Sequence, residues 1–68
     1  MTKAKLTEWQ KEVFYAAAVL IDLADQPGYA TEILSEAGLS GADCSGLDEY
    51  EKERLQSVKN RLGLKGLG

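Results

Sequence analysis

The chain has 68 residues, 44% of them hydrophobic, and eight basic against eleven acidic residues give it a net charge of −3. This length predicts one domain, 1–68, and such a short chain buries only ~60% of the surface that its unfolded form exposes. Small domains therefore often add disulfides, a metal or oligomerisation. A single cysteine excludes an intramolecular disulfide, and the lack of histidine disfavours the common zinc sites. We expect oligomerisation, with no metal and no other cofactor.

The sequence predicts neither export nor membrane insertion. The apolar run from Val13 to Leu20 is shorter than the ~20 residues that span a bilayer, and no small-residue cleavage site follows it. A lone cysteine suits a reducing compartment. We therefore expect a cytoplasmic protein without membrane contact.

The first predicted helix covers about residues 7–25. Thr7 and Gln10 have the spacing of a capping box, and Glu8 lies in the first turn, where the helix dipole favours a carboxylate. Pro27 followed by Gly28 predicts a turn and the end of the helix.

This helix is apolar over an unusually wide arc. One stripe holds Trp9, Val13, Ala16, Leu20 and Leu23, and the second stripe beside it holds Phe14, Ala17, Ile21 and Ala24. Together they cover roughly 220° of the circumference, against ~100° or more for an ordinary surface helix.

Such a wide apolar arc predicts a homodimer. The rest of the chain covers about half of the arc, and two-fold dimers are the commonest assemblies. The alternative is that the other two helices splay around the first and leave a modest exposed patch. The residues predicted at the dimer interface are Trp9, Val13, Ala16, Ala17, Leu20, Ile21 and Leu23.

A second, shorter helix is predicted over about residues 29–37. Its apolar residues Ala30, Ile33, Leu34 and Ala37 repeat as one face of a helix. Gly38 suits the left-handed position of a Schellman ending, with Leu39 packing back on Leu34. The small and polar residues 40–47 predict a loop.

A third helix is predicted over about residues 48–62. Its carboxylates come early and its basic residues late, in the order that complements the helix dipole. Residues 1–6 and 63–68 are predicted to fray. The expected fold is all-α, with three helices in a dimeric helical bundle.

Few residues suit catalysis. Cys44 has no basic residue within seven positions, which predicts an inert thiol. Asp48 and Glu49 are explained as helix-start carboxylates. Asp43, Ser45 and Asp48 lack the ligand spacing of a calcium loop. We expect no catalytic site and no enzyme.

The charge distribution points to proteins as partners. Nine carboxylates and no basic residue lie between Lys11 and Lys52, a pattern that repels nucleic-acid phosphates and favours basic proteins, although a plain solvated surface would look the same. Large aromatic side chains concentrate interface energy. The predicted partner contacts are Tyr15, Tyr29, Tyr50, Glu32 and Glu49.

Two other functions stay open. Ala30 to Leu39 resembles the first helix and turn of a helix-turn-helix, which would make the chain a DNA-binding regulator. The recognition helix would then begin near Ser40 and run into Asp43 and Asp48, whose charge opposes DNA binding. A structural assembly subunit is the third possibility.

In size, acidity and helical build, with boundaries at Thr7–Gln10 and Gly38–Ser40, the chain resembles the small early proteins with which bacteriophages and mobile elements inactivate host machinery. The resemblance covers the whole chain, is one of type, and involves no diagnostic motif. It implies inhibition by binding a host regulatory protein, for example a transcriptional or quorum-sensing regulator.

Overall fold

The structure, a computed structural model, describes residues 6–67 and is mainly helical. Its elements are α1 (Glu8–Ala24), α2 (Pro27–Glu36), α3 (Glu49–Leu55), the 3-10 turn η1 (Gln56–Val58) and α4 (Lys59–Leu62). Within this part of the chain no β-strand forms, and an isolated bridge joins Asp43 to Lys65. The all-α prediction is confirmed.

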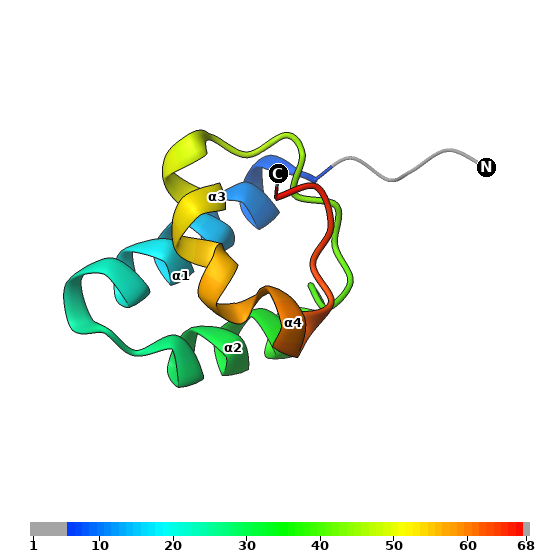
Figure 1. Ribbon diagram of the computed structural model, residues 1–68. Coiled ribbons are helices and arrows are strands. Elements are labelled where there is room, and N and C mark those ends of the chain that lie inside the picture. Colours follow the sequence, from blue (N-terminus) through cyan, green and yellow to red (C-terminus); the bar gives the residue numbers. More distant parts are fainter. Residues whose placement is uncertain (1–5, 68) are drawn as a thin grey trace.

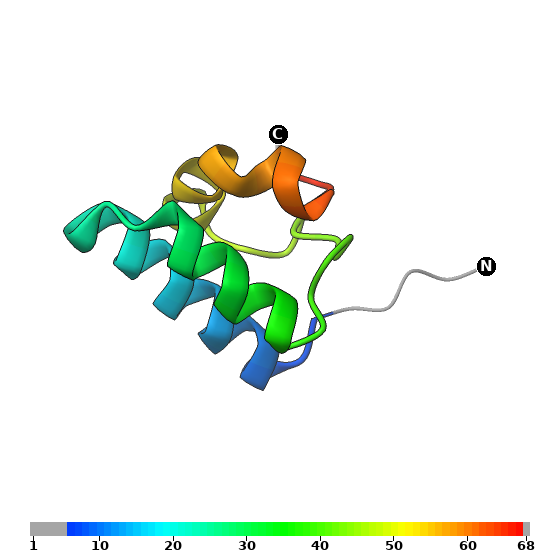
Figure 2. The ribbon, with the colours of Figure 1, turned by 90° about the horizontal axis from the view of Figure 1, so that it is seen from below.

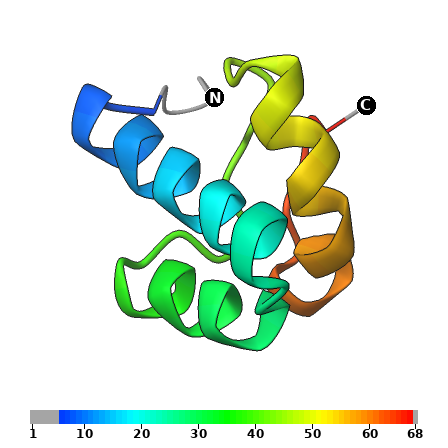
Figure 3. The same ribbon diagram turned by 90° about the vertical axis from the view of Figure 1, so that its left-hand side faces the viewer.

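The helices form two layers. α1 and α2 lie side by side and antiparallel as a helical hairpin, and the α3–η1–α4 segment crosses one side of it (Figures 1, 2 and 3). The core lies between the layers, and the segment after α4 closes one end of it. The hairpin therefore has one side packed inside the molecule and another turned away from α3 and α4.

Interactions between residues close in sequence determine where α1 starts and where the hairpin turns. The backbone N–H of Gln10 donates to Thr7 Oγ1 at 3.1 Å, and the N–H of Thr7 donates to Gln10 Oε1 at 2.9 Å, which confirms the capping box. Asp25 ends α1 in the left-handed region, with φ of 51°. α2 then starts at Pro27, two residues before the predicted start. The backbone N–H at the first helical position has no acceptor within the helix, so proline, which lacks this N–H, loses no hydrogen bond there, and its fixed φ suits the helix.

α2 ends as the sequence predicts. The N–H of Leu39 donates to the carbonyl of Leu34 at 2.9 Å, and that of Gly38 to Ser35 at 3.0 Å. Gly38 has φ of 75°, and Leu39 is buried. These are the two hydrogen bonds of a Schellman ending.

The third predicted helix is broken in its middle. Asp48 precedes α3 and its N–H donates to Glu51 Oε1 at 3.1 Å. At η1 the hydroxyl of Ser57 donates to the carbonyl of Arg54 at 3.1 Å. A 3-10 turn eclipses residues three apart, and Leu55 and Val58 are both fully buried. The third helix predicted over 48–62 is present, and the tighter turn within it brings both side chains into the core.

The C-terminal segment is packed, so the prediction that residues 63–68 fray is wrong for residues 63–67. Leu64 and Leu67 are buried. Burying these two side chains enlarges the apolar core, which is small in a chain of this length. The N–H of Cys44 donates to the carbonyl of Lys65 at 2.7 Å, and that of Lys65 to Ala42 at 3.0 Å. Of the predicted N-terminal fray, Leu6 packs against the core, and residues 1–5 lie outside the described residues, as does residue 68.

The core draws on every part of the fold. Its largest fully buried side chains come from α1, α2, α3, η1 and the loop before α3: Phe14, Leu34, Leu55, Val58 and Cys44. Throughout residues 6–67, no buried side-chain nitrogen or oxygen lacks a hydrogen-bond partner. The single chain thus closes its own core.

Candidate functional site

α1 directs most of the second of its two apolar stripes into the core, while Ala24, at the end of that stripe, is exposed. Phe14 and Ala17 are fully buried, and Ile21 is partly buried against the same cluster. Ala18, which the sequence places among polar residues, is also fully buried. The prediction of Ala17 as a dimer contact is therefore wrong, because its side chain cannot reach a second molecule.

The first stripe lies at the margin of the packed region. Trp9 is 59% exposed and Leu23 is 79% exposed, with Ala16 exposed between them. Val13 and Leu20 are partly buried against the core. Because these five residues follow the 4, 3, 4, 3 spacing of one helix face, they form a continuous apolar strip along α1, called the α1 stripe below.

α2 adds an apolar wall opposite one end of this stripe. Trp9 and Val13 face Ile33 and Ala37 across an open groove of about 530 Å³. Ile33 is 43% exposed, although its spacing predicts a core position. The short α2 buries only Ala30 and Leu34, so Ile33 remains on the margin. These six groove residues are called the α1–α2 groove below: Trp9, Val13, Glu32, Ile33, Glu36 and Ala37.

The groove combines apolar residues from both helices with two carboxylates from α2. Glu32 and Glu36, one helical turn apart on α2, line it, and both are exposed. Glu32 was predicted as a partner contact, whereas Glu36, Ile33 and Ala37 were not. The signal for Glu36 was its i,i+4 spacing from Glu32, which places two carboxylates on one side of a helix.

Tyr15 and Tyr50 lie together on the opposite side of α1, at its contact with α3. Their ring centroids are 6.0 Å apart. The Tyr50 hydroxyl donates to Asp22 Oδ2 at 2.9 Å, and the Arg54 guanidinium lies 4.4 Å from the centre of the Tyr50 ring. Arg54 Nη2 is also 3.5 Å from Asp22 Oδ1. Tyr50 therefore joins α3 to α1 within the molecule.

This contact perturbs the phenol of Tyr50. Desolvation by its neighbours and the hydrogen bond to Asp22 raise the pKa of Tyr50 above its usual value, while the nearby Arg54 opposes the change. Tyr15 stays 55% exposed and Tyr29, in the first turn of α2, is 62% exposed. Glu49 is exposed in the first turn of α3, outside the groove lining. For these three residues partner contact stays a prediction.

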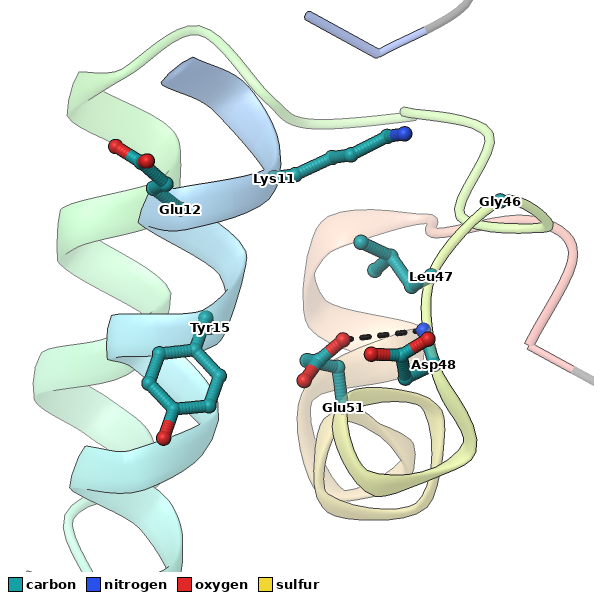
Figure 4. Close-up of a pocket in the computed structure, with 7 residues that line it drawn as sticks. All are labelled: Lys11, Glu12, Tyr15, Gly46, Leu47, Asp48 and Glu51. Carbon is teal, nitrogen blue, oxygen red and sulfur yellow. Dashed lines mark hydrogen bonds between the residues drawn. The ribbon is translucent and has the colours of Figure 1, made fainter. Parts of the chain in front are cut away.

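A second, smaller cavity of about 320 Å³ separates α1 from the loop before α3. Figure 4 shows Lys11 extending across its opening toward Gly46, with Asp48 and Glu51 on the far wall. Glu51 is buried, and its carboxylate accepts the hydrogen bond from Asp48 N–H that begins α3. The geometry thus assigns Glu51 to helix capping. The cavity is lined by both acidic and basic side chains, so its charges favour no one type of ligand.

Cys44 is fully buried beside the C-terminal segment. Burial, aided by the charge of Asp43, raises the pKa of its thiol to about 11. Because the thiolate is the reactive form, this environment favours an unreactive thiol, in agreement with the sequence prediction. Across residues 6–67, no three His, Cys, Asp or Glu side chains are grouped so as to hold a metal ion.

No helix within residues 6–67 has the length and apolar character needed to cross a bilayer. Comparison of the chain with protein-family models, curated proteins and solved structures finds no match.

Proposed function

We propose that the chain is a small acidic protein–protein interaction module that binds its partner through the α1 stripe and the α1–α2 groove. The observation that carries this proposal is the exposure of Trp9, Leu23 and Ile33 on one hairpin whose opposite side closes a complete core. Contiguous exposed apolar residues bordered by polar ones are typical of interaction sites. Trp9, at the end of the α1 stripe that borders the groove, also belongs to the residue types that contribute most binding energy.

The proposal extends to the kind of partner. The resemblance to small early phage proteins supports a host regulatory protein, such as a transcriptional or quorum-sensing regulator, held inactive by occupation of a surface that it needs. The proposal places the chain in the cytoplasm and assigns it no catalytic step. Its one thiol is buried and protonated at neutral pH, which agrees with a role in binding.

The homodimer predicted from the sequence stays a prediction, but the charges on the groove weigh against its simplest form. In a two-fold pair the same surface of both copies meets. Where the two-fold axis passes through the groove, Glu32 and Glu36 of one copy approach those of the other, and α2 has no basic residue to separate them. Like charges brought together at an interface oppose association. We therefore place a different protein, and not a second copy, on the groove.

The DNA-binding alternative loses its structural basis. A helix-turn-helix joins its two helices by a turn of three or four residues. Here residues 37–48 separate α2 from α3, and the segment from Ser40 contains no helix before Glu49. Arg54, one of the basic residues that would meet phosphates, is occupied by Asp22 and Glu53.

Site-specific photo-crosslinking tests the proposal. A photoreactive phenylalanine analogue replaces Leu23 in one variant and Ser57, exposed in η1, in a matched control. After irradiation in a bacterial lysate, we expect a discrete adduct from position 23 and none from position 57. Introducing Ile33→Asp should abolish the adduct while the circular dichroism spectrum is unchanged. The proposal fails if both positions give the same adducts, or if Ile33→Asp leaves the adduct intact.

A further inference from the structure

We infer that the α1–α2 groove accepts a basic amphipathic helix of its partner, with apolar side chains on the groove floor and lysine or arginine side chains beside Glu32 and Glu36. This inference rests on the proposed function and specifies its partner. It follows from the shape of the groove, from its two carboxylates and from the lack of lysine or arginine among the described residues that line it.

The shape favours a helix. The groove runs between two antiparallel helices, and a third helix laid along such a pair completes a helical bundle. Its length is bounded by α2, whose ten residues extend for about 15 Å at 1.5 Å per residue. An occupant of about ten residues would therefore present apolar side chains at positions i, i+4 and i+7, all on one face.

The charges favour a basic occupant. Residues 7–38 hold six carboxylates, namely Glu8, Glu12, Asp22, Asp25, Glu32 and Glu36, against the single cation Lys11. Lys11 lines the other cavity, on the α3 side of α1, and pairs with Glu8 at 3.7 Å. Asp22 is paired with Arg54 and Tyr50. Glu32 and Glu36 are thus the carboxylates that line the groove, and among residues 6–67 no lysine or arginine lines it.

The position of Trp9 provides a direct readout. It is the only tryptophan of the chain, it lines the groove and it is 59% exposed. A helix seated on the groove would remove water from the indole, so its fluorescence emission should shift to shorter wavelength. If the probe peptides contain no aromatic residue, all tryptophan fluorescence comes from Trp9.

The test uses three alanine-based peptides of 12 residues with leucine at i, i+4 and i+7. They differ only in the flanking positions, which are lysine, glutamine or glutamate. Titrated into the full chain at low salt, the lysine peptide should shift Trp9 emission with a micromolar Kd. The glutamine peptide should bind about tenfold more weakly, and the glutamate peptide should give no shift up to ~500 μM. Raising salt to 0.5 M should remove most of the advantage of the lysine peptide.

Variants of the chain identify the groups involved. Glu32→Gln with Glu36→Gln should weaken the lysine peptide about five- to tenfold and leave the glutamine peptide unchanged. Glu53→Gln with Asp25→Asn makes the same change of net charge at exposed positions outside the groove lining and should leave both peptides within twofold of the parent. Ile33→Asp should abolish binding of both peptides, with circular dichroism confirming that the variant is folded.

Several results would overturn the inference. Equal binding of the lysine and glutamine peptides, with the photo-crosslink at position 23 intact, would leave the proposed function standing and remove the basic partner. If both double carboxylate variants weakened binding of the lysine peptide equally, the preference for lysine would come from the net charge of the chain and not from the groove. A concentration-dependent shift of Trp9 without peptide would place a second copy in the groove. Absence of any shift would exclude a helical occupant of this kind.

Discussion

Gly66 is the position where the C-terminal segment comes closest to the loop before α3, and replacing it with alanine tests whether that segment belongs to the folded core. Gly66 has φ of 76°, in the left-handed region. A Cβ atom built there would lie 2.6 Å from Asp43 Oδ1 and 2.7 Å from the backbone nitrogen of Ser45. A side-chain oxygen can rotate away, but the backbone nitrogen moves only if the loop moves.

Gly63 provides the matched control. It also lies in the left-handed region, with φ of 64°, but a Cβ atom there meets nothing within 4 Å. Gly63→Ala should therefore cost only the left-handed backbone penalty, about 1 kcal/mol. Gly66→Ala adds the displacement of the loop, which loosens the hydrogen bonds between Lys65 and residues Ala42 and Cys44. At about 1 kcal/mol for each bond, the total reaches about 3 kcal/mol.

Thermal unfolding followed by circular dichroism at 222 nm measures both variants. For a domain of this size, 1 kcal/mol corresponds to a change of about 4–8 °C in Tm. The difference of about 2 kcal/mol means that Gly66→Ala should lower Tm by about 8–16 °C more than Gly63→Ala does. Equal losses in the two variants would mean that the segment does not press against the loop, and the packing described for Leu64 and Leu67 would then be refuted.

Two further predictions concern titratable groups. The Cys44 thiol should resist an aromatic disulfide reagent at pH 8 in the folded protein and react at once in urea; rapid reaction without denaturant would contradict its burial. Because the folded pKa of Cys44 is about 11 and lies above the unfolded value, the folded state holds its proton more tightly. Stability is therefore expected to fall from pH 9 toward pH 11, and Cys44→Ala should flatten that slope. Tyr50→Phe should lower the urea midpoint more than Tyr15→Phe does, through loss of the hydrogen bond to Asp22. Equal midpoints in the two variants would show that this bond contributes nothing.

Local signals explain how much of the helical layout was predictable. The capping box at Thr7, the Schellman ending at Gly38 and the loop over 40–47 depend on residues within a few positions of one another. Such interactions are encoded in short stretches of sequence. Each of them lies where the sequence predicts it, and the boundaries of α1 and α2 differ from the predicted ones by at most two residues.

The remaining features depend on contacts between distant residues. The sequence of the C-terminal segment predicts a frayed tail because its glycines and single leucines show neither helix nor strand periodicity. In the structure, backbone hydrogen bonds between Lys65 and the loop at 42–44 hold it in place. The break at η1 follows from the need to bury Leu55 and Val58 together. Which of the two α1 stripes faces the core is likewise decided by how α3 crosses the hairpin, a geometry that helix periodicity does not contain.

That geometry separates residues that hold the fold from residues that serve the proposed interface, and a last prediction tests the separation. Leu23, 79% exposed on α1, should tolerate Leu23→Gln with a change below about 0.5 kcal/mol. The fully buried Leu55 should lose about 2–5 kcal/mol on Leu55→Ala. Urea denaturation at 5 and 100 μM measures both variants, because a dimer closed by the α1 stripe would gain stability with concentration. A Leu23→Gln loss above about 1.5 kcal/mol that grows with concentration would place a second copy on the stripe. A loss of that size at both concentrations would show that Leu23 stabilises the monomer fold, and would contradict the proposal that the α1 stripe binds a partner.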